Sequence, residues 1–569
     1  KKFFVQSDLL NSKYDVAITN PPYMSYKGMN SNLKKFVKDK FKNSSSDLYA
    51  VFLERLKEFT IFCGINSSVT QHSWMYLKSF EKLRKKIIDE QTIHNITHLG
   101  TRAFDEIGGE VVQTSAQVLR NVKINFYKST FIRLIDYKSS ELKKNNFLNR
   151  KNKYVAMQNE FKKIPGYPFT YWISEKFRDL FGNQRLDKVA FSEGQILTGN
   201  NDKYLRMLWE VDKNRIGTDK KWAPHTKGGE YRKWFGNVDM LVDWSPETRS
   251  YYRNNKIARI PPEYIWYKDG ITWSGTSGGS KKSFRYLSHD TTFNKAAPSI
   301  FFNSEYDLYF VLGLLNTTIT RKILTMLNPT LYTAVSDVLK VPLLEVDKKK
   351  KKEVIDLVKE NISISERDWN FNEYALDFIS HPFISIDEDK RYLSNAFNEW
   401  KEFTDSKIAL MKNNEEKLNS IFLKLYGLEN EINPGVFEKD IVLTKADRET
   451  DTISLLSYFI GCVLGRYSLD VDRLVCAGND FDQSKYDTFK PSQNGLIQLT
   501  DDRYFDNDII LRLREFLSVA FSQDTVDENM QWLAESLEMK KNESVEGRLR
   551  RYFLDDFFKD HCKTYQKLP

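Results

Sequence analysis

The first 125 residues alternate short strand-like runs with a segment of helical periodicity, and this alternation most constrains the fold. Residues 16–19 and 65–70 have the composition and length of strands. Between them, the segment that begins at Asp47 places apolar side chains at a helical period, at Leu48, Val51, Phe52, Leu56 and Phe59. Strand, helix and strand in this order predict a parallel α/β sheet, in which ligands bind beyond the carboxyl ends of the strands. We also predict a strand at residues 3–5.

Residues 16–19 lead directly into Asn20, Pro21, Pro22 and Tyr23, at the point where such a sheet forms its binding site. The side-chain oxygen of Asn20 and the carbonyl oxygen of Pro21 are acceptors suited to the two N–H bonds of an exocyclic amine. Two acceptors draw the amine nitrogen toward a tetrahedral form and direct its lone pair at an electrophile. The prolines stiffen the loop, and Tyr23 can stack on a flipped base. The alternative interpretation is a proline-stiffened turn without chemistry.

This four-residue motif resembles the fourth motif of the amino-methyltransferases that use S-adenosyl-L-methionine. Upstream, "QSDLL" is similar to their third motif, in which an acidic residue at a strand end accepts from the cofactor adenine, and Asp8 matches that residue. Downstream, "SSSDLYAVFLERL" is similar to the helix that begins their fifth motif, and "GINSSVTQHSWM" to the strand and loop that follow. The resemblance implies that Asp8 and Asn20 contact the cofactor, and that the flipped adenine lies between Tyr23 and Phe104.

Longer phrases narrow the resemblance to the PglX family, the adenine-specific DNA methyltransferases of BREX phage-defence systems. These phrases are "VTQHSWM", "FEKLR", "GTRAFDEIGGEVVQTSAQVLRN" and "ISLLSYFIGCVLGRYSLD". The resemblance implies site-specific adenine-N6 methylation that marks self DNA, with a role in phage restriction. The implied partners are double-stranded DNA with a flipped adenine, other BREX proteins and phage-encoded DNA-mimic inhibitors, and no membrane. The family's Gly-rich first motif is absent from this sequence, so we expect the chain alone to be inactive or nearly so.

The whole chain is interpreted as a Rossmann-like methyltransferase sheet, partial at its N-terminus, followed by a mixed α+β region and a mainly helical region. The predicted domains are the C-terminal part of the catalytic domain at residues 1–150, a DNA target-recognition domain at 151–345, a helical spacer at 346–430 and a truncated helical domain at 431–569.

Basic residues of the middle region are the candidates for DNA contact. The segment "GITWSGTSGGSKKSFRY" predicts a glycine-rich loop that approaches phosphate, held by Lys281, Lys282 and Arg285, with a flexible surface loop as the alternative. A second segment, "KKWAPHTKGGEYRKWFGN", interleaves aromatic and basic residues. That pattern suits base stacking with phosphate contact, although large cores also collect aromatic residues.

Two patterns occur in the helical half of the chain. Residues 348–352 are five lysines at the start of a predicted helix, and we favour a solvated helix start over a phosphate contact. Residues 391–426 predict a long helix, whose apolar stripe we interpret as ordinary core rather than as a spacer between modules. The stripe consists of Leu393, Phe397, Trp400, Phe403, Met411, Leu418 and Phe422.

Composition excludes several classes of protein. Lys and Arg outnumber Asp and Glu by 86 to 77, and this net charge of +9 permits nucleic-acid binding without requiring it. The four cysteines lie far apart without a histidine cluster, which argues for a reducing cytoplasm and against structural zinc. No apolar run approaches the ~18 to 20 residues of a membrane span. Motifs typical of ATPases, serine hydrolases and nucleases are missing from the sequence.

The sequence leaves open the role of two residues and the choice between three functions. His72 and Trp74 follow a predicted strand near the expected site, where a structural role and a place beside the base are equally plausible. The chain also fits a non-catalytic DNA-binding or partner-binding module of a defence assembly, or a restriction-modification protein that fuses methylation with cleavage.

Overall fold

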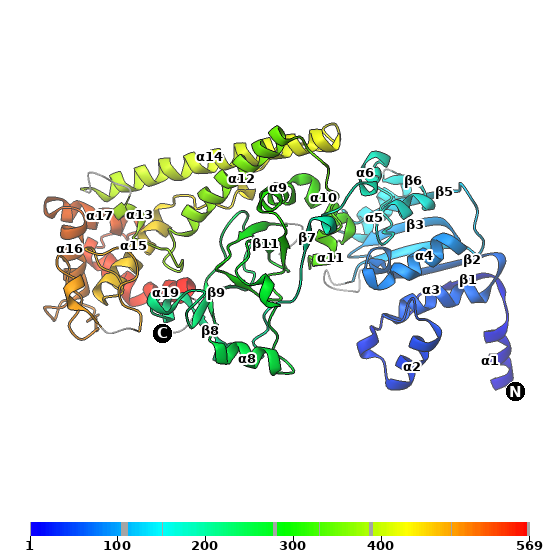
Figure 1. The fold of residues 1–569 in the computed structure, drawn as a ribbon, viewed down its shortest axis with the longest axis horizontal. Helices are drawn as coiled ribbons and strands as arrows, with labels where there is room; N and C mark the ends of the chain where they lie inside the picture. Colours follow the sequence, from blue (N-terminus) through cyan, green and yellow to red (C-terminus); the bar gives the residue numbers. More distant parts are fainter. Residues whose placement is uncertain are drawn as a thin grey trace. The chain divides into compact units, whose positions relative to one another are not determined.

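The computed structural model describes residues 2–103, 112–150, 152–276, 282–328, 331–385, 391–478 and 481–565 (Figure 1). The chain forms two compact units. The first consists of Lys1–Lys188, Lys322–Thr330 and Ser336–Leu344, and the second of Val189–Arg321, Leu331–Val335 and Glu345–Pro569. The first unit extends past the boundary that we predicted at residue 150, because the strand at Lys153–Met157 belongs to its sheet.

A six-stranded sheet of order β1-β2-β4-β3-β5-β6 organises the first unit. Its strands are β1 (Tyr14–Thr19), β2 (Thr60–Gln71), β3 (Thr92–Gly100), β4 (Thr114–Arg120), β5 (Lys128–Arg133) and β6 (Lys153–Met157). β1 pairs in parallel with β2, and β3 with β5, whereas β4 runs antiparallel between β2 and β3. The carboxyl ends of β1, β2, β3 and β5 therefore meet at one edge, and the predicted α/β fold is confirmed.

The first unit also contains the helices α2 (Ser31–Lys40), α3 (Leu48–Phe59), α4 (Glu81–Glu90), α5 (Ser140–Leu148) and α6 (Glu175–Asp179). The predicted helix is α3, which begins after the N-cap residue Asp47 and connects β1 to β2. α3 and α4 contact β2 and β3 (Figure 1), and their apolar faces form one core with the sheet, which includes Leu53, Ile87, Ile96 and Phe131.

The close approach of β2 to β1 depends on a glycine and an asparagine. The register of the pair shifts between Tyr14 and Val16. At this shift, a Cβ atom on Gly64 would lie 2.9 Å from the carbonyl oxygen of Asp15, so a larger residue would force the strands apart. The Asn121 side chain donates to the carbonyl oxygens of Thr60 and Ile61, over 3.0 and 3.2 Å, and holds the irregular part of β2.

The strand predicted at residues 3–5 is wrong. Lys2–Asn11 form a helix, α1, on which Phe3, Phe4 and Leu10 are exposed. β1 is an edge strand of the described sheet, with Val16 and Ile18 53% and 74% exposed. Lys2–Asn11 pair with no strand in the described residues, and the backbone of α1 satisfies its hydrogen bonds locally.

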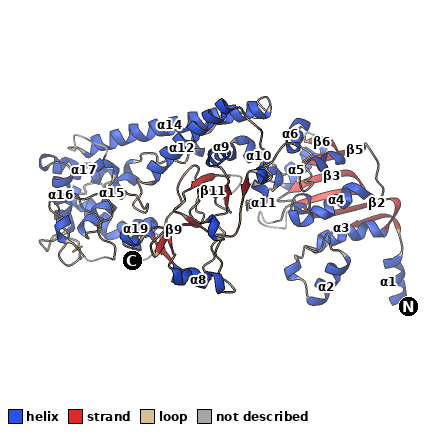
Figure 2. Cartoon of the chain, in the orientation of Figure 1, coloured by secondary structure: helices blue, strands red, loops and turns tan. Residues whose placement is uncertain are grey.

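The second unit combines irregular β structure with long helices (Figure 2). One four-stranded sheet has the order β13-β9-β10-β8 and the other β12-β11-β14-β7. The strands are β7 (Ala190–Phe191), β8 (Leu205–Met207), β9 (Trp222–Thr226), β10 (Met240–Asp243), β11 (Gly270–Trp273), β12 (Phe284–Leu287), β13 (Thr292–Phe293) and β14 (Ser299–Phe302). The predicted mixed α+β region is therefore present after the first sheet.

Helices make up most of the chain beyond residue 304. They are α9 (Glu305–Leu315), α10 (Thr318–Leu327), α11 (Val335–Val338), α12 (Lys348–Trp369), α13 (Pro382–Ser385), α14 (Leu393–Tyr426), α15 (Arg448–Val463), α16 (Ile509–Ala520), α17 (Val526–Ser536), α18 (Val545–Arg551) and α19 (Phe557–Tyr565); the short α7 (Asn201–Tyr204) and α8 (Pro246–Asn254) precede them. The lysines at 348–352 form the first turns of α12, after the N-cap residue Asp347.

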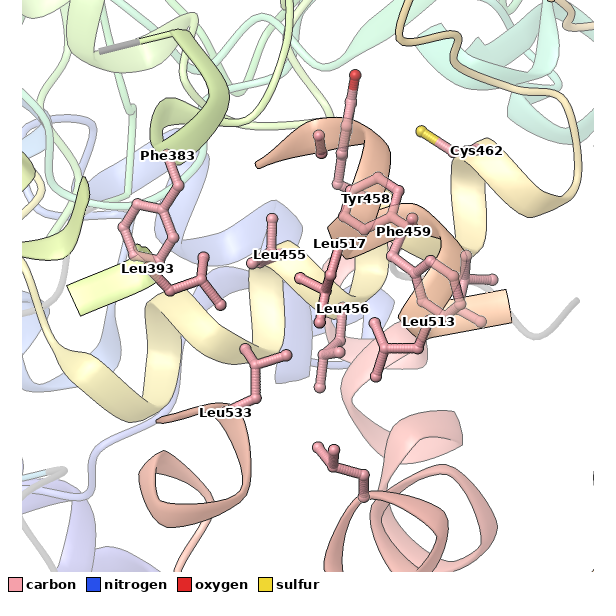
Figure 3. Packing of buried hydrophobic residues seen from close by; sticks show 14 of the residues in the cluster. Phe383, Leu393, Leu455, Leu456, Tyr458, Phe459, Cys462, Leu513, Leu517 and Leu533 are labelled. Atoms are coloured by element: carbon pink, nitrogen blue, oxygen red, sulfur yellow. The ribbon is translucent and has the colours of Figure 1, made fainter. Parts of the chain in front are cut away.

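The predicted long helix is α14, and its stripe is core as we favoured. Leu393, Trp400, Met411, Leu418 and Phe422 are buried, and the helix ends at Gly427, whose φ of 62° is left-handed. The N-terminal part of α14 packs with α13, α15, α16 and α17 around a cluster of buried hydrophobic residues, several of which are labelled in Figure 3. These are Phe383, Leu393, Leu455, Leu456, Tyr458, Phe459, Cys462, Leu513, Leu517 and Leu533.

Neither a membrane span nor a metal site emerges from the described residues. No single described helix is long and apolar enough to cross a bilayer, although Asp307–Leu315 and Thr318–Leu327, bent by 74°, together reach the required length and composition. The described ranges also contain no group of three or more His, Cys, Asp or Glu side chains arranged to hold a metal ion.

Arg84 connects α4 to two loops through its fully buried guanidinium group. Its nitrogens donate to the carbonyl oxygens of Trp74, Leu77 and Gly166 over 2.6 to 2.9 Å. Burial lowers the pKa of Arg84 to about 10. Removing this side chain would leave three carbonyl groups without their donor inside the protein.

We expect Arg84→Met to lower the free energy of unfolding of the first unit by roughly 2–4 kcal/mol, because methionine fills the space but donates no hydrogen bond. The measurement is chemical denaturation followed by circular dichroism. The matched control is Lys85→Met, an exposed position on the same helix, which should change stability by less than about 0.5 kcal/mol. Equal losses in the two variants would contradict this account of Arg84.

Candidate active site

The Asn-Pro-Pro-Tyr motif lies directly after β1, at the edge where the parallel strands end. Pro21 is buried, whereas Asn20 and Pro22 are exposed and Tyr23 is half-buried. The loop therefore has a packed, rigid base and presents the Asn20 carboxamide to solvent, where a ligand can reach it. This is the position that the sequence predicted for the motif.

A single carboxylate holds the loop to α3. Asp47 caps α3, and its Oδ1 also accepts from the backbone N–H of Met24 at 3.1 Å. Two further backbone bonds, from Leu48 N–H to the Met24 carbonyl and from Tyr26 N–H to the Ser46 carbonyl, complete the connection at 2.9 and 3.0 Å. Burial raises the pKa of Asp47. Sequence reasoning identified the helix but missed this role, for which an acidic residue directly before an apolar helix is the available signal.

The ring of Tyr23 is oriented by a buried neighbour. It packs edge-to-face against Tyr49, with ring centroids 5.8 Å apart and planes 80° apart. The Tyr49 hydroxyl shares a 2.7 Å hydrogen bond with Ser73 in the loop after β2. The Tyr23 hydroxyl is buried and has no hydrogen-bond partner among the described residues, and this burial raises its pKa. The motif, α3 and the loop after β2 are thus joined through aromatic and hydroxyl contacts.

Two histidines lie beside each other where β2 and β3 end. The Nδ1 atom of His72 is 2.7 Å from Nε2 of His98, and Nδ1 of His98 is 3.0 Å from the Tyr171 hydroxyl and 3.3 Å from the Tyr76 hydroxyl. Burial lowers the pKa of His72 to about 4. The pKa of His98 is also lowered, first by burial and then by the charges of His72, Arg133 and Lys143. Both rings are therefore neutral near pH 7.

Trp74 is a core residue. Its side chain is fully buried and packs edge-to-face on Phe169, with ring centroids 5.2 Å apart. Its carbonyl oxygen accepts from Arg84. Of the two roles that the sequence left open, Trp74 has the structural one, because no base can reach a side chain without exposed surface.

Asp8 does not occupy the strand end that we predicted for it. It lies on the exposed helix α1, which is connected to the amino end of β1 by a 2.8 Å hydrogen bond from the Tyr14 hydroxyl to the Leu9 carbonyl. Asn20 follows the opposite end of β1. The local helical hydrogen bonds of α1, including Ser12 N–H to the Asp8 carbonyl, explain the difference. Phe104, the expected second aromatic, lies outside the described residues.

The predicted DNA contacts near residue 285 require a correction. Arg285 is fully buried, and its guanidinium donates to the carbonyl oxygens of Arg232 and Gly228 at 3.3 and 3.2 Å. Burial lowers its pKa to about 9. Lys282 is only 8% exposed, and Lys281 lies outside the described residues. A phosphate cannot reach Arg285, because its side chain is fully buried.

The aromatic and basic segment near residue 232 is also internal. Arg232 pairs with Asp368 of α12 at 2.5 Å, and Lys233 with Glu415 of α14 at 2.5 Å. Trp234 is 2% exposed and donates to the same Glu415 carboxylate at 2.9 Å. Of the two interpretations, the structure supports packing, since these side chains connect the β structure to the helices.

Acid should destabilise the first unit through His72. Because burial lowers its folded pKa to about 4, the unfolded chain binds a proton below about pH 6.5 while the folded chain resists it. The stabilisation is complete above pH 6.5 and is lost as the pH falls toward 4. Between pH 7.5 and pH 5, the free energy of unfolding should fall by about 1–2 kcal/mol less in His72→Gln than in the wild type.

The measurement is thermal unfolding of the wild type and His72→Gln across that pH range. His94→Gln, at an exposed position on β3, is the control and should keep the wild-type pH dependence. If His72→Gln showed the same pH dependence as the wild type, His72 would not be the acid-sensitive group.

Comparison with known proteins places the chain in a family. Residues 1–104 match the family model described as Eco57I restriction-modification methylase. The chain is 39% identical over 589 residues to adenine-specific methyltransferase PglX of Lacticaseibacillus casei (strain Zhang), an alignment covering 98% of this chain and 48% of that protein. It is 34% identical over 601 residues to adenine-specific methyltransferase BrxX of Escherichia coli O9:H4 (strain HS), covering 100% and 49%.

Among solved structures, the Type IIL restriction-modification enzyme MmeI in complex with DNA is similar with a TM-score of 0.47 and 10% identity, covering 74% of this chain and 55% of that chain. The chain spans about half the length of the curated relatives that it matches. The sequence-based resemblance is therefore confirmed by the curated relatives: this chain belongs to the family of the adenine-specific methyltransferases PglX and BrxX.

Proposed function

We propose that the protein of which this chain is a part methylates the N6 amine of a target adenine in DNA. The observation that carries the proposal is the Asn20–Pro21–Pro22–Tyr23 loop, with an exposed carboxamide on a buried proline base at the carboxyl end of β1. The two relatives are named adenine-specific methyltransferases, which supports adenine as the methylated base. A role in BREX phage defence, with methylation marking self DNA, is the further expectation from the PglX resemblance.

The loop residues act on the target amine. The Asn20 side-chain oxygen and the Pro21 carbonyl oxygen each accept one N–H of the adenine amine, which directs the nitrogen lone pair away from the ring. Because Pro21 is buried and Asp47 fixes Met24, these acceptors are positioned before the base arrives. Tyr23 offers a ring face to the flipped base while Tyr49 fixes its tilt.

The cofactor of this reaction is S-adenosyl-L-methionine, which supplies the methyl group when bound. The described residues fit the target-base side better than the cofactor side, because Asp8 lies on a helix tied to the opposite end of β1 from Asn20. The exposed Val16 and Ile18 on β1 support a proposal that other parts of the whole protein cover this edge and supply the rest of the cofactor site. This chain aligns with about half the length of each of the two relatives.

Asn20→Ala in the whole protein should lower the rate of adenine methylation at least 100-fold, because one of the two acceptors for the amine is lost. Binding of duplex DNA should change less than about threefold, since the substitution removes no charge. The readouts are sequencing for N6-methyladenine and a DNA-binding titration.

The matched control is Asn32→Ala, at an exposed position on α2 outside the loop, which should methylate like the wild type. Persistent N6-methyladenine in the Asn20→Ala protein would refute the assigned role of the loop. A wild-type protein that binds DNA but methylates no adenine would instead favour a non-catalytic binding module.

A further inference from the structure

A cationic hollow occurs in the second unit, away from the basic residues that proved to be buried. This cavity of about 710 Å³ lies between the end of α8 and the segment at residues 192–195. Arg253, Lys256 and Arg259 line it, together with the neutral side chain of Gln195. None of the described residues that line it carries a carboxylate. The hollow is therefore positively charged, and a polyanion is the ligand class that it attracts.

A rigid turn presents two of these cations. Asn255 follows α8, and its Oδ1 accepts from the backbone N–H groups of Ile257 and Ala258 at 2.8 and 3.1 Å. The buried Ala258 anchors the turn. Arg259 then exchanges two backbone hydrogen bonds with Leu197, at 2.8 and 3.0 Å. Residues 255–259, which we call the 255–259 turn, are thus fixed at both ends, while Lys256, Ile257 and Arg259 are exposed.

Lys256 and Arg259 form no ion pair with a described residue, whereas the neighbouring Arg253 does. Arg253 forms an ion pair with Glu263 and lies 5.5 Å from the centre of the Trp266 ring. For Lys256 and Arg259, no ion pair with a described carboxylate occurs within 4.0 Å. Two unpaired, exposed cations beside a hollow without carboxylates are suited to contact phosphate, because no internal partner must be displaced.

Ile257 lines a second hollow next to the first in the sequence of the turn. It is 72% exposed, and it lines a second cavity of about 330 Å³ together with Thr198, Asn201 and Asn294. Lys256 and Arg259 line the first cavity. An exposed apolar side chain flanked by cations matches the chemistry of duplex DNA, whose phosphates border grooves that present thymine methyl groups and base edges.

We propose that the 255–259 turn is a duplex-DNA contact, in which Lys256 and Arg259 bind phosphates and Ile257 enters the groove between them. This proposal rests on the proposed function, because it names where the second unit meets the DNA substrate. It differs from the contact predicted at Lys281, Lys282 and Arg285, of which Lys282 and Arg285 are buried and Lys281 lies outside the described residues. The turn supplies affinity through charge and position through its rigid backbone, and it takes no part in the chemistry at Asn20.

The test is DNA binding by the whole protein over a series of salt concentrations, using a duplex that the wild type methylates. The double variant Lys256→Gln/Arg259→Gln should bind about tenfold more weakly or worse, and the slope of log affinity against log salt should fall by about 2, since roughly one counterion is released per phosphate contact. Arg259→Lys alone, which keeps the charge, should retain most of the wild-type slope.

The matched control is Lys417→Gln/Arg503→Gln, which removes the same two charge types at exposed positions of the second unit outside both hollows. It should leave the salt slope within about 0.5 of the wild type. Thermal unfolding of each variant checks that the fold is retained.

Outcomes separate this proposal from the proposed function. If the wild type methylates its duplex but the Lys256→Gln/Arg259→Gln protein binds it with wild-type affinity and slope, the DNA contact is overturned and the methyltransferase assignment stands. Weakened binding of single-stranded RNA with unchanged binding of duplex DNA would also overturn it. A wild type that methylates no adenine refutes the proposed function, whatever the variants bind.

Discussion

The parallel pairing of β1 with β2 is the constraint on which the candidate site depends. It brings the residues after β1 to the same edge as the residues after β2, so that Tyr23 and Ser73, 50 positions apart, meet through Tyr49. The pairing tolerates an irregular register only because Gly64 has no side chain and Asn121 supplies the missing donors. Asp47 then fixes the loop to α3, because its carboxylate caps this helix and accepts a hydrogen bond from the backbone N–H of Met24.

Burial decides which charged residues are available for binding. In the second unit, Lys233 and Arg232 are committed to Glu415 and Asp368, and Arg285 is surrounded by carbonyl groups. Such buried, paired cations join the β structure to α12 and α14 and cannot meet a phosphate. The exposed cations of the 255–259 turn are less conspicuous in the sequence, because no run of lysines or glycines surrounds them. Charge alone therefore identifies a candidate protein for DNA binding but not its contact surface.

Local patterns predicted the elements that depend on local physics. Apolar periodicity and an N-cap residue located α3, and the stripe from Leu393 to Phe422 located α14, because both signals repeat within a few turns of helix. The same reasoning failed for residues 3–5. Phe3 and Val5 have strand propensity, but a strand needs a hydrogen-bonded neighbour, and residues 2–11 pair with no strand of the described sheet and form α1 instead.

By itself the sequence determined the order of strand, helix and strand, the rigid Asn-Pro-Pro-Tyr loop and the family resemblance, all of which reside in contiguous residues. Only the tertiary structure decided that His72 faces His98, that Trp74 and Arg285 are buried, and that Asp8 lies at the far end of β1 from Asn20. These facts depend on which distant segments share a strand edge or a core. The type of a side chain determines what it can bind, whereas its neighbours in the fold determine whether it is accessible to a ligand.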